Sequence, residues 1–244
     1  MLDTTSRPLL EIAGLEAWYG ESHILHGVDF NVRQGEVVTL LGRNGAGKTT
    51  TLKSIMGMVG KRKGSVRFEA TETIGLASDK IARLGIALCP EERGIFASLD
   101  VKENLLLPPQ VKPGGLPLDQ IFELFPNLKE RLSSQGTKLS GGEQQMLAIG
   151  RILRTGATLL MLDEPTEGLA PVIIQQIGHT IRKLKAQGFT ILLVEQNFLF
   201  ASSLGAHVSV IDDGRIAHSG AMAELTQDKD LQTRLLSLSL DAHQ

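Results

Sequence analysis

Apolar positions along the chain follow two strand-like patterns. Residues 9–12 and 28–32 partly alternate between apolar and polar side chains, as half-buried antiparallel strands do. Residues 36–41, 158–162 and 190–194 are more continuously apolar, which is typical of strands covered on both faces. The chain therefore predicts an antiparallel sheet near its start and a second, buried sheet.

Helical periodicity appears between the buried strands. Thr49 to Met58 carries apolar residues on one face, and Glu143 to Leu153 does the same. Pro171 suits the first turn of a further helix, whose apolar residues recur at helical spacing until Gly188 ends the pattern. This alternation predicts an α/β fold with a mostly parallel sheet that is covered by helices on both faces.

The stretch 90–138 has a different character. Four prolines fall within 108–117, which excludes a regular helix or a central strand there. We interpret the stretch as a small helical lobe with a proline-rich loop and a helix over 119–125, although the prolines also fit a surface insertion without function. The predicted organisation is a single domain, 1–244, in which 1–89 and 139–244 form a core and 90–138 forms the lobe.

Composition narrows the possible functions. The chain has 244 residues, 42% of them hydrophobic, and a formal net charge of −2, so it can build a core and gives no electrostatic case for nucleic acid as a partner. Cys89 is the only cysteine, which excludes an intrachain disulfide and fits a reducing compartment. No stretch reaches the roughly 18 to 20 apolar residues that cross a bilayer, and the polar start lacks the apolar stretch of a secretion signal. We therefore expect a cytoplasmic protein that reaches a membrane through partners.

A glycine-rich loop follows the first buried strand. Residues 42–49 read GRNGAGKT, which fits the G-x-x-x-x-G-K-[ST] pattern, and the loop lies between a strand and a helix as that motif requires. Backbone N–H groups of this loop can converge on phosphate oxygens at the start of the helix. Lys48 would bridge the β- and γ-phosphates and assist catalysis, and the Thr49 hydroxyl would hold Mg²⁺. The predicted nucleotide contacts are Gly42, Arg43, Asn44, Gly45, Ala46, Gly47, Lys48, Thr49 and Thr50.

Two carboxylates follow a second buried strand. Asp163 ends this strand, which puts its carboxylate at the edge of the sheet that also carries the glycine loop. There Asp163 can hold Mg²⁺, and Glu164, one position further, can polarise the attacking water. We predict Asp163 as a metal ligand and Glu164 as the general base.

A second turn of small residues opens the helix upstream of these carboxylates. Ser140-Gly141-Gly142-Glu143 offers a hydroxyl and exposed amides at a helix start, which could clamp a γ-phosphate. Many helices begin with Ser-Gly, so this turn alone is a weak indication of a phosphate site. Its position just upstream of Asp163 and Glu164 makes the indication stronger.

Three motifs together, GRNGAGKT, LSGGEQQ and LLMLDEP, resemble those of the nucleotide-binding subunits of ABC transporters, over nearly the full chain. The resemblance implies an ATPase with a P-loop NTPase (RecA-like) core, an N-terminal antiparallel β-subdomain and an inserted α-helical subdomain. It implies that ATP and Mg²⁺ are bound and that two subunits pack head to tail. Residues 140–143 of one subunit would then cover the ATP on residues 42–50 of the other. Tyr19 matches the aromatic position that stacks on adenine, and we expect the neighbouring Trp18 to lie in the core.

Three positions depart from the common family pattern. Glu91 stands where a glutamine usually senses Mg²⁺ and the γ-phosphate, and we expect its carboxylate to ligate the metal. Gln196 stands where many relatives have a histidine, and it can donate a hydrogen bond to the γ-phosphate but cannot shuttle a proton. Ala170 replaces a common aspartate, so a contact across the interface is expected to be lost.

A further set of motifs narrows the resemblance. PEER…IF, DEPTEGLAP and LLVEQN look like ATP-binding subunits of branched-chain or hydrophobic amino-acid importers of the LivF type, with urea and short-amide importers as close relatives. This implies two membrane-spanning permeases, a second ATP-binding subunit that is like or unlike this one, and indirectly an external substrate-binding protein. The subunit would lie at the inner face of the cell membrane. Alternatives are a soluble ABC ATPase acting on DNA, ribosomes or protein assembly, and a small-molecule phosphotransferase built on the same loop.

Overall fold

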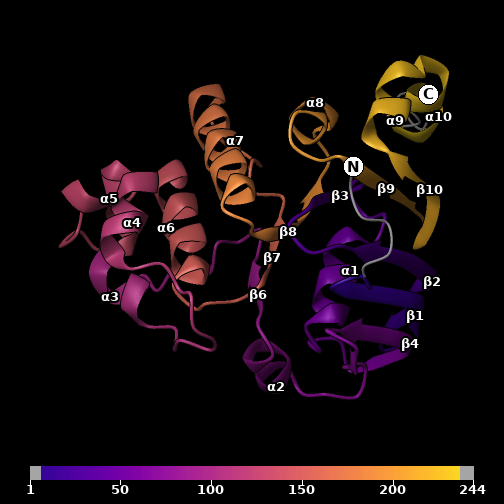
Figure 1. Cartoon of the computed structure of the whole chain (residues 1–244), viewed down its shortest axis with the longest axis horizontal. Coiled ribbons are helices and arrows are strands. Elements are labelled where there is room, and N and C mark those ends of the chain that lie inside the picture. Colours follow the sequence, from indigo (N-terminus) through magenta and orange to yellow (C-terminus); the bar gives the residue numbers. More distant parts are fainter. Residues whose placement is uncertain (1–6, 237–244) are drawn as a thin grey trace.

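Two sheets organise the chain in a computed structural model that describes residues 7–236 (Figure 1). The strands are β1 (Leu10–Tyr19), β2 (Ser22–Val32), β3 (Val37–Leu41), β4 (Lys61–Phe68), β5 (Thr71–Glu72), β6 (Ile86–Cys89), β7 (Leu159–Asp163), β8 (Thr190–Glu195), β9 (His207–Asp212) and β10 (Arg215–Ala221). The first sheet is antiparallel with the order β2-β1-β4-β5, and the second has the order β10-β9-β3-β8-β7-β6. In the second sheet only β10 runs antiparallel to its neighbour. Both predicted sheets are confirmed.

Helices connect the strands and form a separate group. Those around the sheets are α1 (Lys48–Ile55), α2 (Ser78–Arg83), α6 (Gly141–Leu153), α7 (Pro171–Ala186), α8 (Phe198–Ser202), α9 (Met222–Gln227) and α10 (Lys229–Leu236), with a short 3₁₀ turn at Gly136–Lys138. Between β6 and α6 the chain forms α3 (Val101–Leu106), α4 (Leu118–Leu124) and α5 (Pro126–Glu130), and α3 and α5 contact α6. As the prolines predict, residues 107–117 contain neither helix nor strand.

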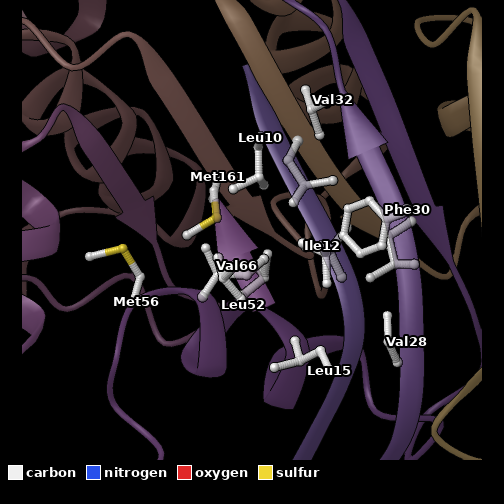
Figure 2. Packing of buried hydrophobic residues seen from close by; sticks show 14 of the residues in the cluster. Leu10, Ile12, Leu15, Val28, Phe30, Val32, Leu52, Met56, Val66 and Met161 are labelled. Carbon is white, nitrogen blue, oxygen red and sulfur yellow. The ribbon is translucent and has the colours of Figure 1, made fainter. Parts of the chain in front are cut away.

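The mixed sheet separates two hydrophobic cores. Leu159 and Met161 of β7 lie in a core with α1 and the antiparallel sheet, and Figure 2 shows Met161 beside Leu52 of α1 and Leu10 of β1. The alternate residues Leu160 and Leu162 belong to a core with α3 to α7. Successive side chains of a strand point to opposite faces, so α1 and α6 lie on opposite faces of the sheet.

One expectation about the antiparallel sheet was wrong. Trp18 is only partly buried and stacks on His23 with ring centroids 4.2 Å apart, and Lys61 Nζ lies 5.0 Å from the Trp18 ring centroid. Its neighbour Ala17 is fully buried instead. Register shifts along β1 decide which residues face the core, and such shifts leave no clear mark in the pattern of residues.

Candidate functional site

The glycine loop joins β3 to α1 in a conformation that side chains would prevent. A Cβ on Gly42 would lie 2.6 Å from the carbonyl oxygen of Ile211, and Gly47 has a φ of 110°. Gly47 caps α1 without any side-chain hydrogen bond to the helix. The first N–H groups of α1 are therefore left for a ligand, and an anion is the ligand that a helix start favours.

Lys48, the first residue of α1, forms a buried ion pair across the site. Its Nζ lies 3.1 Å from Oε1 of Glu164 and donates to the Arg43 carbonyl oxygen at 2.8 Å. The Lys48 and Glu164 side chains are only 3% and 8% exposed, so the pair is shielded from water and salt. Glu164 also has a φ of 43°, a left-handed conformation that is uncommon for a non-glycine residue. The predicted phosphate ligand and the predicted base therefore meet at one point.

Thr49 and Asp163, the chain neighbours of Lys48 and Glu164, also contact each other. The Thr49 hydroxyl donates to Oδ1 of Asp163 at 3.2 Å. Burial raises the pKa of Asp163 to about 6, with the Thr49 hydrogen bond opposing the shift and the Glu164 charge adding to it. A hydroxyl and a carboxylate side by side form an oxygen donor pair that suits Mg²⁺. Within residues 7–236 no group of three or more His, Cys, Asp or Glu side chains is arranged to hold a metal ion.

A cavity of about 290 Å³ opens over these residues. It is lined by Ile24, Asn44, Gly45, Gly47, Lys48, Thr49, Thr50, Glu91, Glu164 and Glu167. The structure thus brings the predicted residue Glu91 to the same cavity as the glycine loop, although the two lie about forty residues apart in sequence. Ile24 and Glu167 were not predicted. Glu167 follows Glu164 by three residues and could have been found from that spacing, whereas Ile24 lies opposite the register shift between Ala17 and Trp18, which the residue pattern does not reveal.

A buried carboxylate beside the site was also missed. Glu195 ends β8 and is 2% exposed, and its Oε1 accepts a 2.8 Å hydrogen bond from the Thr166 hydroxyl. Burial raises the pKa of Glu195 to about 7, partly opposed by the Thr166 hydrogen bond, while the nearby Glu164 charge raises it further. Glu195 could have been predicted in the same way as Asp163, because each is a carboxylate that ends a continuously apolar strand.

This carboxylate gives a pH-dependent stability prediction. Folded Glu195 keeps its proton to about pH 7, whereas the unfolded chain loses it near 4.5, so the free energy of unfolding falls as pH rises from about 4.5 through about 7. Glu195→Gln removes this ionisation and can still accept from Thr166. We expect the variant to exceed wild type by about 1–3 kcal/mol at pH 8 and to match it at pH 4, measured by urea unfolding. The exposed Glu11→Gln is the control, and an equal difference at both pH values would contradict the prediction.

The second small-residue turn caps a helix elsewhere in the fold. Ser140 Oγ accepts from the Glu143 N–H at 3.3 Å, and Glu143 Oε2 accepts from the Ser140 N–H at 2.8 Å, which forms a reciprocal cap at the start of α6. Residues 140–143 do not line the cavity of their own chain, and α6 lies on the sheet face opposite α1. Figure 1 shows α1 and α6 on different sides of β6 and β7. The turn therefore does not meet the glycine loop within one described chain.

Tyr19 and Gln196 are among the predicted site residues that do not line the cavity; Gly42, Arg43, Ala46 and Asp163 do not line it either. Tyr19 ends β1 beside the hairpin turn and is 48% exposed, so its side chain is accessible from solvent. Gln196 directly follows β8 and is also exposed. Neither lines the cavity, and their predicted contacts with nucleotide stay predictions.

A glycine-rich loop at the end of β3, a buried carboxylate at the end of β7, an antiparallel sheet and a helical lobe together define an ATP-binding cassette. The ABC transporter family profile matches residues 25–167, which is more than half of the chain. The chain belongs to the ABC transporter family, and it is an ATPase of the cassette type that binds nucleotide.

Curated relatives and solved structures agree with this family. The chain is 44% identical to the high-affinity branched-chain amino acid transport ATP-binding protein BraG of Pseudomonas aeruginosa, covering 91% of this chain and 97% of BraG. It is 36% identical to the probable branched-chain amino acid transport ATP-binding protein LivF of Archaeoglobus fulgidus, covering 92% and 97%. The crystal structure of a nucleotide-free cassette from an ABC transporter matches with a TM-score of 0.79 and 25% identity, covering 92% and 97%. A dimeric bacterial ABC transporter cassette shares the fold with a TM-score of 0.75 and 23% identity, covering 87% and 98%.

The described helices include no membrane-spanning candidate. Between residues 7 and 236, none of them combines the length and apolar character that a bilayer crossing needs.

Proposed function

We propose that this chain is the ATP-hydrolysing subunit of an importer for branched-chain or other hydrophobic amino acids. The identity with BraG and LivF over nearly their full lengths supports this substrate class. Uptake of urea or short amides, and a soluble ABC ATPase that does no transport, remain the alternatives, and nucleic acid is not a proposed partner. In this proposal the subunit works in the cytoplasm at the inner face of the cell membrane, attached through two permeases that receive substrate from an external binding protein.

The nucleotide site follows from the cavity. Lys48 and the amides of residues 42–50 bind the phosphates, and the Tyr19 ring stacks on the adenine. The side chains of Thr49, Glu91 and Asp163 hold Mg²⁺, which when bound would neutralise phosphate charge and orient the phosphate oxygens. Gln196 donates a hydrogen bond to the γ-phosphate.

The Lys48–Glu164 ion pair links binding to catalysis. When phosphates take Lys48 as their partner, the Glu164 carboxylate loses its counter-ion beside the site of water attack. A carboxylate released in this way can accept the proton of the attacking water. Glu164 is therefore restrained in the empty site and becomes available as a base when nucleotide is bound.

The single observation that supports a head-to-tail pair is the separation of the two glycine turns. Residues 140–143 do not line the cavity of their own chain, although they form a capped helix start of the kind that binds anions. A second ATP-binding subunit, like or unlike this one, supplies the missing lid in trans. A solved cassette that shares this fold is also a dimer.

The helical lobe, residues 90–138, is the proposed permease contact. Three of its large apolar side chains are about half exposed, namely Phe96 at 50%, Leu106 at 46% and Leu107 at 48%. Apolar side chains that are gathered on one lobe and left open to water favour an interface with a partner.

An aspartate substitution tests this contact. We expect Leu107→Asp to weaken association with the permeases by roughly 10- to 100-fold, because burying a leucine-sized side chain is worth about 1.5–3 kcal/mol. ATP binding by the isolated subunit is expected to stay unchanged. The matched control is Leu199→Asp, which alters a more exposed leucine, 80% exposed, outside the lobe. Equal permease capture by both variants from detergent-solubilised membranes would refute the proposed surface.

Reconstitution tests the function as a whole. The subunit should co-purify with hydrophobic membrane proteins, and vesicles containing the complex should take up leucine when ATP and a substrate-binding protein are supplied. Uptake of urea or acetamide instead of leucine would favour the first alternative. Co-purification with ribosomes or DNA, and no permease, would favour the soluble ATPase.

A further inference from the structure

The chain leaving β6 contains a strained arginine. Arg93 has a φ of 62°, a left-handed conformation that costs a non-glycine residue about 1–3 kcal/mol and persists where surrounding contacts impose it. Two such contacts come from Arg151 of α6, whose Nη2 donates to the Arg93 carbonyl oxygen at 3.1 Å and whose Nη1 donates to that of Gly94 at 2.7 Å. The Arg93 N–H also donates to the Pro90 carbonyl oxygen at 2.9 Å. Glycine is the usual residue in this conformation, so the presence of an arginine directs attention to its side chain.

The Arg93 side chain lies against the start of α6. Its Nη1 and Nη2 are 3.3 Å and 3.6 Å from the point where a Cβ on Gly141 would lie, and its Nε donates to Oε1 of Gln145 at 3.3 Å. Within residues 7–236, neither terminal nitrogen makes a hydrogen bond or an ion pair. The guanidinium is thus held at the turn through Nε, while the N–H donors of Nη1 and Nη2 remain unused.

The charges around this turn favour an anion. Glu143 accepts from Ser140 and lies 3.5 Å from Arg131 Nε, so its carboxylate already has a cationic partner. Arg93 therefore adds positive charge to the partial positive charge of the α6 N-terminus. A guanidinium offers two parallel donors that match phosphate oxygens.

Arg93 does not line the nucleotide site of its own chain. Glu91, two residues earlier, lines that cavity. Within the short segment 91–93, Glu91 thus lies at the nucleotide cavity and Arg93 lies at the start of α6.

We propose that Arg93 is a phosphate-binding residue of the lid, which donates to the terminal phosphate of the nucleotide held by the partner subunit. The proposal rests on the head-to-tail pairing inferred above. It predicts that Arg93 contributes to ATP-driven pairing and contributes nothing to nucleotide binding by a single subunit.

The test uses the full chain with the hydrolysis-blocking substitution Glu164→Gln, so that ATP persists. Dimer formation is followed by analytical ultracentrifugation over a series of MgATP concentrations, and MgADP binding to the monomer is measured by calorimetry. Arg93→Gln is expected to raise the ATP concentration for half-maximal dimer by roughly 10- to 100-fold, the effect of losing hydrogen bonds from a charged group. For Arg93→Lys, the ATP concentration for half-maximal dimer should lie between those of the parent and of Arg93→Gln. Lysine keeps the positive charge but lacks the two parallel N–H donors of the guanidinium. MgADP affinity should not change.

A matched control and three outcomes decide the case. Arg83→Gln, which removes an exposed arginine of α2, should leave both measurements unchanged. Dimer formation by Arg93→Gln at the parent ATP concentration would overturn the proposal. An equal loss of MgADP affinity would overturn it too, because that result indicates damage to the fold. If the parent Glu164→Gln protein forms no dimer at any ATP concentration, the pairing of two like subunits, on which this test depends, is refuted.

Discussion

Replacing Glu164 by glutamine should slow ATP hydrolysis by at least about 100-fold, the low end of the contribution of a general base. Glutamine keeps the size of the side chain and can still accept a hydrogen bond from Lys48, so the fold and the cavity should be preserved. The loss of charge also frees Lys48 from its ion pair at 3.1 Å, which should leave ATP binding as tight as in wild type or tighter. ATP that binds but is not hydrolysed should accumulate a closed dimer.

Steady-state phosphate release and gel filtration with ATP measure the two effects. Glu167→Gln is the comparison variant, since it removes the same charge from the same cavity. Its loss of turnover should stay within about tenfold, because Glu167 is exposed and its charge is screened by water. Turnover by Glu164→Gln at the wild-type rate would remove Glu164 from the role of base.

Replacing Lys48 by alanine should cost roughly 10- to 100-fold in affinity for ATP, because the phosphates lose a charged hydrogen-bond donor at the start of α1. Hydrolysis should fall at least as far. The substitution has a second effect that is distinct from binding. It leaves the Glu164 carboxylate 8% exposed without its cationic partner, and breaking a buried ion pair from one side costs about 3–5 kcal/mol of stability.

The double variant Lys48→Ala/Glu164→Gln separates these effects. It should regain much of the lost stability, since no unpaired buried charge remains, but it should not regain ATP affinity. Urea unfolding and calorimetric titration with MgATP give the two quantities. Tight ATP binding by Lys48→Ala, or an unfolding free energy equal to wild type, would contradict the arrangement.

Local chemistry made part of this protein predictable from its residues. The strand, glycine loop and α1 follow from a contiguous pattern, and Asp163 was placed at a sheet edge because a continuous apolar run ends there. The α/β alternation also gave the correct order of strands and helices between residues 143 and 194. These features depend on neighbours in the chain, so the sequence carries them directly.

Other features depend on how distant segments pack. The Lys48–Glu164 and Thr166–Glu195 contacts require β8 to lie between β3 and β7, an order that no single segment encodes. The position of Trp18 outside the core depends on register shifts in β1, and the orientation of Arg93 depends on Arg151, which lies 58 residues further along. These contacts could be found only after the strands had been set side by side.

The placement of α1 and α6 on opposite faces of one sheet has a consequence for the behaviour of the protein at low abundance. In the proposed head-to-tail pair, a single subunit can hold nucleotide but cannot complete the enclosure around it. Turnover per molecule should therefore climb with protein concentration and fade on dilution. Stray copies that have not joined a transporter would spend little of the cell's ATP, and no dedicated inhibitor is needed to keep them idle.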